Sequence, residues 1–154
     1  MSETLEGSCV PTPTAVHERW LPRHRRSAGV GRRVLREFLG EVEGGERFAE
    51  VGELLLSELV ANAVEHARVP QGRLIQTRFE MAGGLLWIEV HDASNKQPAV
   101  CAPDRNDESG RGLWLVRQLS VGWGVLPRPC GVGKFVWCAI EPARRATCEY
   151  GISG

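Results

Sequence analysis

Lysine is scarce in this chain, and neither sign of charge is in excess. Only Lys96 and Lys134 are lysines among 19 basic residues, a bias typical of codon usage in GC-rich genomes rather than of a binding task. With 19 acidic residues, the formal net charge is +0. A neutral chain has no bulk electrostatic attraction to nucleic acid or to an anionic membrane. The composition therefore argues against direct nucleic-acid binding.

Paired cysteines and long apolar runs are also missing. The five cysteines are scattered, without a CxxC pair or a Cys/His cluster, which argues against structural zinc and a disulfide scaffold and favours a reducing cytoplasm. The N-terminus lacks the basic start and apolar core of a signal peptide. No apolar run approaches the ~20 residues that span a bilayer. We expect a cytoplasmic protein without a membrane segment.

The length of 154 residues suffices for one well-filled core and is too short for two. Residues 1–15 are rich in Ser, Thr, Pro and Gly, which predicts a disordered lead, and residues 142–154 are expected to form a flexible tail. The sequence therefore predicts a single folded domain over residues 16–141.

Hydrophobic periodicity predicts helices and strands in a definite order. We expect an edge strand over 17–21, helices over 27–42 and 48–67, a strand pair over 73–81 and 85–92, a helix over 110–119, and strands over 121–126 and 134–140. Residues 93–109 show no sustained period and are interpreted as a functional lid loop. This order predicts an α+β two-layer sandwich, with helices covering one face of a mostly antiparallel sheet.

The second predicted helix carries polar residues at four-residue steps. Glu58, Asn62 and His66 fall along one stripe of it. Asn62 offers a neutral oxygen ligand for Mg²⁺ that bridges phosphates, and Glu58 can accept a proton from a hydroxyl group or water. A solvated helix face explains the stripe equally well. A separate apolar face is expected to be buried, formed by Val51, Leu54, Leu55, Leu59, Ala63 and Ala67.

Asp92 ends an apolar strand, where its carboxylate can accept a hydrogen bond from an exocyclic amine such as that of adenine. The competing explanation is the commoner one for an isolated Asp: its side chain starts a turn by accepting from the backbone of Ser94 or Asn95. Further along, Gly110-Arg111-Gly112 precedes an apolar helix and leaves its first amide groups open to an anion. Ordinary helix capping explains that motif equally well, because it matches neither a Walker loop nor a dinucleotide fingerprint.

Taken together and in this order, these segments resemble the gyrase and histidine-kinase type of ATPase. The similarity is to its small stand-alone form, the anti-sigma-factor serine/threonine kinases and related ATP-binding regulatory proteins, and it spans residues 19–140. The segment ELVANAVEH resembles the family's Asn box and VHDASNKQP its adenine segment. The segment ESGRGLWLVRQLSVGWGV of this chain resembles the family's lid and phosphate segment, and GKFVWCAI resembles its closing strand.

The resemblance implies ATP and Mg²⁺ as ligands and assigns a role to each motif. Glu58 would be the general base, Asn62 the Mg²⁺ ligand and Asp92 the acceptor for the adenine amine. The remaining nucleotide contacts would come from Ser94, Gly110, Arg111, Gly112 and Leu113.

His66 extends the polar stripe and is expected either to flank the phosphates or to bind backbone carbonyls at the helix end. Lys134 stands where a Thr often contacts the base in this family. We expect it either to contact a phosphate or the lid, or to be a solvated lysine at a strand end, and the solvated role is preferred. The residues Ala93 to Lys96 also depart from the family, which commonly has glycines after the Asp.

By the same resemblance, the chain would be an anti-sigma-factor serine/threonine kinase that binds a sigma factor and phosphorylates an antagonist protein, commonly as a homodimer. The alternative is a non-catalytic ATP-binding interaction module. Glu58 favours the kinase, whereas the altered adenine segment and Lys134 favour the module. The basic run between Arg19 and Arg36 is interpreted as a docking surface for a protein partner, because no helix-turn-helix pair is recognisable.

Overall fold

The computed structural model describes residues 15–66, 74–92, 111–129 and 133–144. Within these ranges the chain forms strands and helices in one order. They are β1 (Ala15–Pro22), α1 (Ser27–Gly40), a 3-10 turn (Gly45–Phe48), α2 (Ala49–His66), β2 (Leu74–Ala82), β3 (Leu85–Asp92), α3 (Arg111–Leu119), β4 (Gly122–Pro127) and β5 (Lys134–Ile140). The predicted order is confirmed, with small differences at the element ends. The predicted lead and tail fall almost wholly outside the described residues, so the domain boundaries stay predictions.

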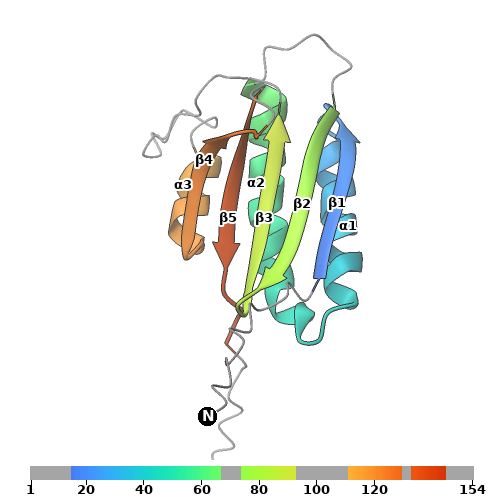
Figure 1. Cartoon of the computed structure of the whole chain (residues 1–154), viewed down its shortest axis with the longest axis vertical. Helices are drawn as coiled ribbons and strands as arrows, with labels where there is room; N and C mark the ends of the chain where they lie inside the picture. Colours follow the sequence, from blue (N-terminus) through green and yellow to red (C-terminus); the bar gives the residue numbers. More distant parts are fainter. Residues whose placement is uncertain (1–14, 67–73, 93–110, 130–132, 145–154) are drawn as a thin grey trace, which may run out of the picture.

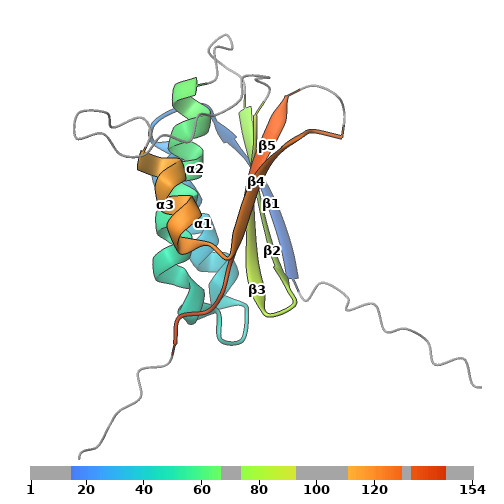
Figure 2. The same cartoon turned by 90° about the vertical axis from the view of Figure 1, so that its left-hand side faces the viewer.

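The strands form one antiparallel sheet in the order β1-β2-β3-β5-β4. Helices α1, α2 and α3 all lie on the same face of it, as Figures 1 and 2 show. The predicted α+β two-layer sandwich is therefore confirmed. As predicted, β1 is an edge strand. Among the described helices, none has both the length and the apolar character needed to cross a membrane.

The hairpin between β2 and β3 sets the register of the central strands. Gly83 and Gly84 adopt φ angles of 61° and 75°, a region that only glycine enters at low cost, as the sequence predicted for this turn. The register continues from β3 into β5 and ends with Asp92 opposite Lys134. Two residues far apart in the sequence are thereby neighbours at one end of the sheet.

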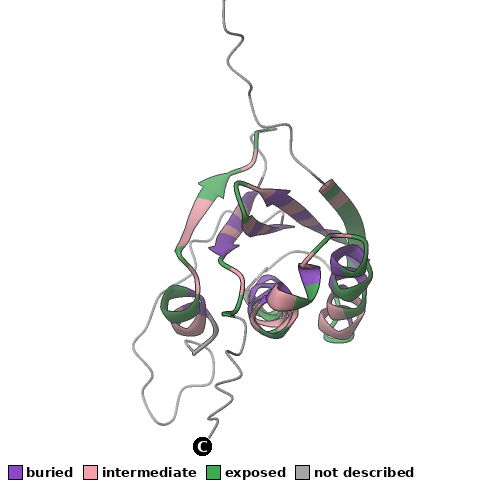
Figure 3. Cartoon of the chain, turned by 90° about the horizontal axis from the view of Figure 1, so that it is seen from below, coloured by how far each residue is buried: buried purple, intermediate pink, exposed green. Residues whose placement is uncertain are grey.

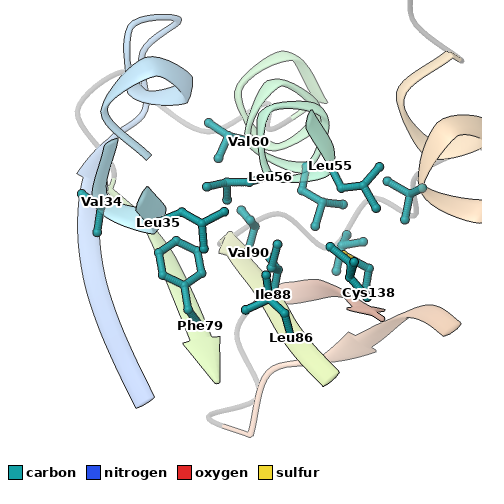
Figure 4. Packing of buried hydrophobic residues seen from close by; sticks show 14 of the residues in the cluster. Val34, Leu35, Leu55, Leu56, Val60, Phe79, Leu86, Ile88, Val90 and Cys138 are labelled. Carbon is teal, nitrogen blue, oxygen red and sulfur yellow. The ribbon is translucent and has the colours of Figure 1, made fainter. Parts of the chain in front are cut away.

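The hydrophobic core fills the space between the helices and the inner face of the sheet (Figures 3 and 4). Strands β2 and β3 alternate between buried inner residues and half-buried outer ones, the pattern of a sheet covered on one side. The labelled core residues in Figure 4 are Val34, Leu35, Leu55, Leu56, Val60, Phe79, Leu86, Ile88, Val90 and Cys138. Each aliphatic side chain of this kind contributes ~1.5–3 kcal/mol when fully buried.

The buried face of α2 differs from the one that the sequence predicted. Leu55, Leu59 and Ala63 are buried as expected, but Leu54 is 41% exposed and its assignment to the core was wrong. Leu56 and Val60, which the prediction omitted, are both 0% exposed. The reason is that α2 packs against α1, α3 and β3 together, which widens its apolar face and turns Leu54 outward. Leu54 thus joins the row of Glu58 and Asn62, at four-residue steps. Ala67 lies outside the described residues.

Candidate functional site

The segments that carry the predicted site residues meet at one end of the molecule. The C-terminal half of α2, the end of β3 and the beginnings of α3 and β5 all lie toward the upper end in Figures 1 and 2. Helix α2 contacts α3, β3 and β5 directly. Antiparallel pairing explains the meeting, because β3 ends where β5 begins. The fold therefore brings three separate sequence motifs to one place.

Glu58 and Asn62 sit one turn apart on α2, and both side chains are half-buried. Their neighbours Leu59 and Ala63 are packed into the core and hold this row at the edge of the helix. Burial raises the pKa of the Glu58 carboxyl above its ordinary value, and the negative charge of Glu65 raises it further. A carboxylate with a raised pKa is a stronger proton acceptor, which suits a general base.

The sequence interpretation missed Glu65, whose charge acts on the Glu58 carboxyl. It is exposed, and it lies seven residues after Glu58, which is close to two full helical turns. The seven-residue spacing was a signal visible in the sequence. The prediction considered only the four-residue spacing of Glu58, Asn62 and His66.

Asp92 and Lys134 are both deeply buried, with 5% of each residue exposed. They are paired across β3 and β5, and both occupy the inner face of the sheet, which the helices cover. The preferred expectation of a solvated Lys134 was therefore wrong. The error arose because a lysine at a strand end is usually exposed, whereas here the strand end is still under the helix layer. Both residues have interaction partners.

Helix α3 begins at Arg111, next to the C-terminal half of α2. Leu113 and Val116 anchor it, since they are 4% and 0% exposed and belong to the core. This packing fixes the direction of the helix axis and hence of its first amide groups. The side chains of Arg111, Gly112 and His66 are not described, and Ser94, Gly110 and the predicted lid over 93–109 lie outside the described residues. The contacts predicted for these residues stay predictions.

Part of the basic run packs α1 against α2. The Arg32 guanidinium donates to Ser57 Oγ at 2.9 Å, and Arg36 Nε donates to Glu53 Oε1 at 2.7 Å. Arg23 donates to the Val64 carbonyl at 3.4 Å. These three arginines therefore fix the position of α2 and with it the Glu58 row. In the same run, Arg25, Arg26 and Arg33 are exposed.

A cavity of about 360 Å³ lies beside the C-terminal half of α2, on the side of α1. Its lining includes Arg25 and Ala28 before and within α1, and Val60 and Glu65 of α2. Glu58 and Asn62 are not among its lining residues. The cavity is thus a neighbour of the candidate site and not the site itself.

The donor set fits a nucleotide with Mg²⁺. In the described ranges, no three His, Cys, Asp or Glu residues come together as a metal-binding group. Mg²⁺ does not require one, because it keeps several waters and takes only one or two protein ligands in addition to substrate phosphates. A single amide oxygen from Asn62 meets that need. The predicted roles of Asp92 as acceptor for a base and of the start of α3 as donor to phosphate are chemically compatible with the same ligand, and they stay predictions.

Comparison with known proteins agrees with this chemistry. The family model described as the histidine kinase-like ATPase domain matches residues 21–121, which include α1, α2, β2, β3 and α3. No curated protein sequence matches the chain.

Among solved structures, the chain is similar to the RsbU and RsbW domains of Rv1364c from Mycobacterium tuberculosis, with a TM-score of 0.64 and 22% sequence identity. The similarity covers 88% of this chain and 34% of that one, so the chain spans about a third of that protein. At this identity the likeness shows the fold. The family model, in contrast, matches well over half of the sequence, including the segments that carry Glu58, Asn62 and Asp92. The chain belongs to the histidine kinase-like ATPase domain family.

Proposed function

We propose that the protein is an Mg²⁺- and ATP-dependent anti-sigma-factor serine/threonine kinase, which acts in the cytoplasm and phosphorylates an antagonist protein. The observation that supports the kinase role most is Glu58. It is a half-buried carboxylate with a raised pKa, one helical turn from Asn62, on the helix that contacts α3, β3 and β5. An ATP-binding protein that only recognises the nucleotide has no need of a carboxylate in that place.

In this proposal, Glu58 accepts the proton of the target serine hydroxyl. The serine oxygen forms a bond to the γ-phosphorus, the bond between that phosphorus and the bridging oxygen breaks, and ADP leaves with the electron pair. Such a transfer depends mainly on positioning and on charge stabilisation. Burial of Glu58 keeps its proton affinity high, and Glu65 increases it. The rigid packing of Leu59 and Ala63 holds the carboxylate in place.

Asn62 holds Mg²⁺ in this proposal, and the metal when bound offsets phosphate charge. A neutral amide oxygen suits this place, because a second carboxylate beside Glu58 would raise the repulsion with the phosphates. The first amide groups of α3, together with Gly110, Arg111 and Gly112, approach the phosphates, while Leu113 anchors that helix start. His66 and Ser94 are further proposed nucleotide contacts. Asp92 accepts a hydrogen bond from the adenine amine.

The proposed partners are a sigma factor and its antagonist protein, and the active form is proposed to be a homodimer. Among the exposed cations of the basic run, Arg19, Arg25, Arg26 and Arg33 are the proposed docking residues. Arg32 and Arg36 are poor candidates, because their side chains already bind α2.

The second candidate is a non-catalytic ATP-binding module that reports nucleotide occupancy to a partner. It is favoured by Lys134, a buried cation at a position where the family often has a Thr. The two candidates differ in one measurable property, which is whether γ-phosphate leaves ATP for a serine.

Transfer of labelled γ-phosphate to purified candidate antagonist proteins tests the kinase role. We expect Glu58→Gln to keep ATP binding and to lower the transfer rate by about 10²–10⁴-fold, the usual contribution of a general base. Glu50→Gln is the matched control, because Glu50 is an exposed carboxylate two turns earlier on the same helix. ATP binding by the wild type without any transfer would favour the module, and an unchanged rate in Glu58→Gln would remove Glu58 from the chemistry.

A further inference from the structure

We propose that Lys134 selects the nucleobase together with Asp92. The ammonium group of Lys134 donates a hydrogen bond to N1 of adenine, while the Asp92 carboxylate accepts one from the exocyclic amine. This inference rests on the proposed function, since it concerns the base subsite of the same ATP site. The matched family segment ends at residue 121, so Lys134 lies beyond it.

The pairing of the two strands places these groups side by side. Lys134 opens β5 and Asp92 closes β3, and they are the last pair of that ladder. Side chains directly opposite each other in an antiparallel pair have Cβ atoms ~4.5–5.5 Å apart. The next inner pair along the ladder is Val90 with Val136, which are 1% and 3% exposed. The polar pair therefore marks the point where the inner face changes from apolar core to site.

Lys134 differs from a surface lysine because its charged group is buried. With 5% of the residue exposed, its ammonium group is largely removed from water, which is costly unless the charge is paired and hydrogen-bonded. On the outer face at this end, the rings of His91 and Phe135 stack with their centroids 4.5 Å apart. A lysine buried to this extent needs groups nearby that pair with its charge.

The pair has enough hydrogen-bonding capacity to bind each other and a base. An ammonium group carries three donors and a carboxylate has about four acceptor positions. The two groups together present an acceptor beside a donor. Adenine presents the complementary order on its edge, with the N6 amine as donor beside N1 as acceptor.

Guanine presents the opposite order, with O6 as acceptor beside an N1–H donor. In the same orientation its O6 would face the Asp92 carboxylate and its N1–H would face the Lys134 ammonium. Both contacts would be repulsive, so this pair would reject guanine as well as accept adenine. Mispaired buried polar groups are the strongest source of such discrimination.

The sharpest test changes one atom of the ligand. In 1-deaza-ADP a CH group replaces N1, which removes the acceptor while keeping the amine and the phosphates. Calorimetric titration of the whole chain with ADP and 1-deaza-ADP, with Mg²⁺ present, compares the two. We expect the wild type to bind 1-deaza-ADP about tenfold more weakly or worse, the effect of losing a hydrogen bond to a charged group.

The same titrations on Lys134→Met assign the effect to the lysine. The difference between ADP and 1-deaza-ADP should nearly vanish in Lys134→Met and persist in part in Lys134→Arg, which retains a cationic donor. The comparison of two ligands on the wild type does not depend on the folding of either variant. Thermal unfolding of both variants checks that they are native.

Three outcomes would overturn the inference. Equal affinity of the wild type for ADP and 1-deaza-ADP would mean that Lys134 does not contact N1, while the proposed function would stand. A loss of ADP affinity in Lys134→Met without a loss of adenosine affinity would assign the lysine to phosphate. If the wild type bound no adenine nucleotide, the proposed function would fail and this inference with it.

Discussion

The orientation of α2 decides which of its rows faces the site, and truncation of two leucines tests that orientation. Leu56 is 0% exposed, whereas Leu54, two residues earlier, is 41% exposed. Both lie in the interior of the same helix, so the change in helix propensity from Leu to Ala is equal at both positions and cancels in the comparison. What remains is the difference in packing.

The structure predicts the size of each effect. Leu56→Ala removes a fully buried side chain and leaves a cavity between α2 and the rest of the core, which costs about 2–5 kcal/mol. Leu54→Ala removes a side chain that is only a little more than half-buried, and water fills the space, so the loss is about 1–2 kcal/mol. We therefore expect Leu56→Ala to be the more destabilising, by about 2 kcal/mol when the middles of the two ranges are compared.

Urea denaturation of both variants and the wild type, followed by circular dichroism, measures these losses as differences in the free energy of unfolding. The slopes should agree between variants, since a changed slope would signal a change in compactness rather than in packing. If Leu54→Ala cost as much as Leu56→Ala, the row of Leu54, Glu58 and Asn62 would face the core. The proposed site on α2 would then lose its geometric basis.

Two further predictions follow from the titratable groups. Burial and the charge of Glu65 raise the pKa of Glu58 in the folded state above its ordinary value of 4.5, so ionising Glu58 destabilises the folded state. The stability of the wild type is therefore undiminished below the unfolded pKa and falls as the pH rises from there through the folded pKa. Glu58→Gln should thus be as stable as the wild type near pH 4 and more stable at pH values above the folded pKa of Glu58. Thermal melts at a series of pH values would measure this difference. Equal stability of the two proteins at all pH values would contradict the raised pKa. Burial raises the pKa of the Cys138 thiol to about 12, so peptide mapping after maleimide treatment of the native chain at mildly alkaline pH should find this residue unlabelled, and labelled after denaturation. Labelling of Cys138 at the rate of an exposed thiol would mean that β5 opens readily.

Several features of the fold were predictable because they depend on short-range patterns. Strict alternation in β2 and β3, with two glycines between them, predicted the central hairpin, since a side chain at either glycine would strain the turn. The polar stripe of α2 was predictable for the same reason: four-residue steps place Glu58 and Asn62 on one row of any helix. Asp92 at a strand end was also visible in the sequence.

The burial and the contacts of the misassigned residues depend on which other elements pack against them. Leu54 and Leu56 are equally apolar, and only the packing of α2 against α1, α3 and β3 makes Leu56 part of the core. Arg32 and Arg36 were part of a predicted docking surface, but their partners Ser57 and Glu53 lie on the other helix of the pair. The helical period fixes the angle between residues around the helix axis, but it does not determine which side of the helix faces the core.

The sequence by itself determined the order of the helices and strands, the two-layer class and the position of the segments that carry the proposed site residues, because each is encoded in residues close together along the chain. The tertiary structure alone decided that Lys134 is buried opposite Asp92, since the two are distant in sequence and meet only through the pairing of β3 with β5. It also decided the raised pKa of Glu58, because desolvation depends on how much of the surrounding chain covers a group.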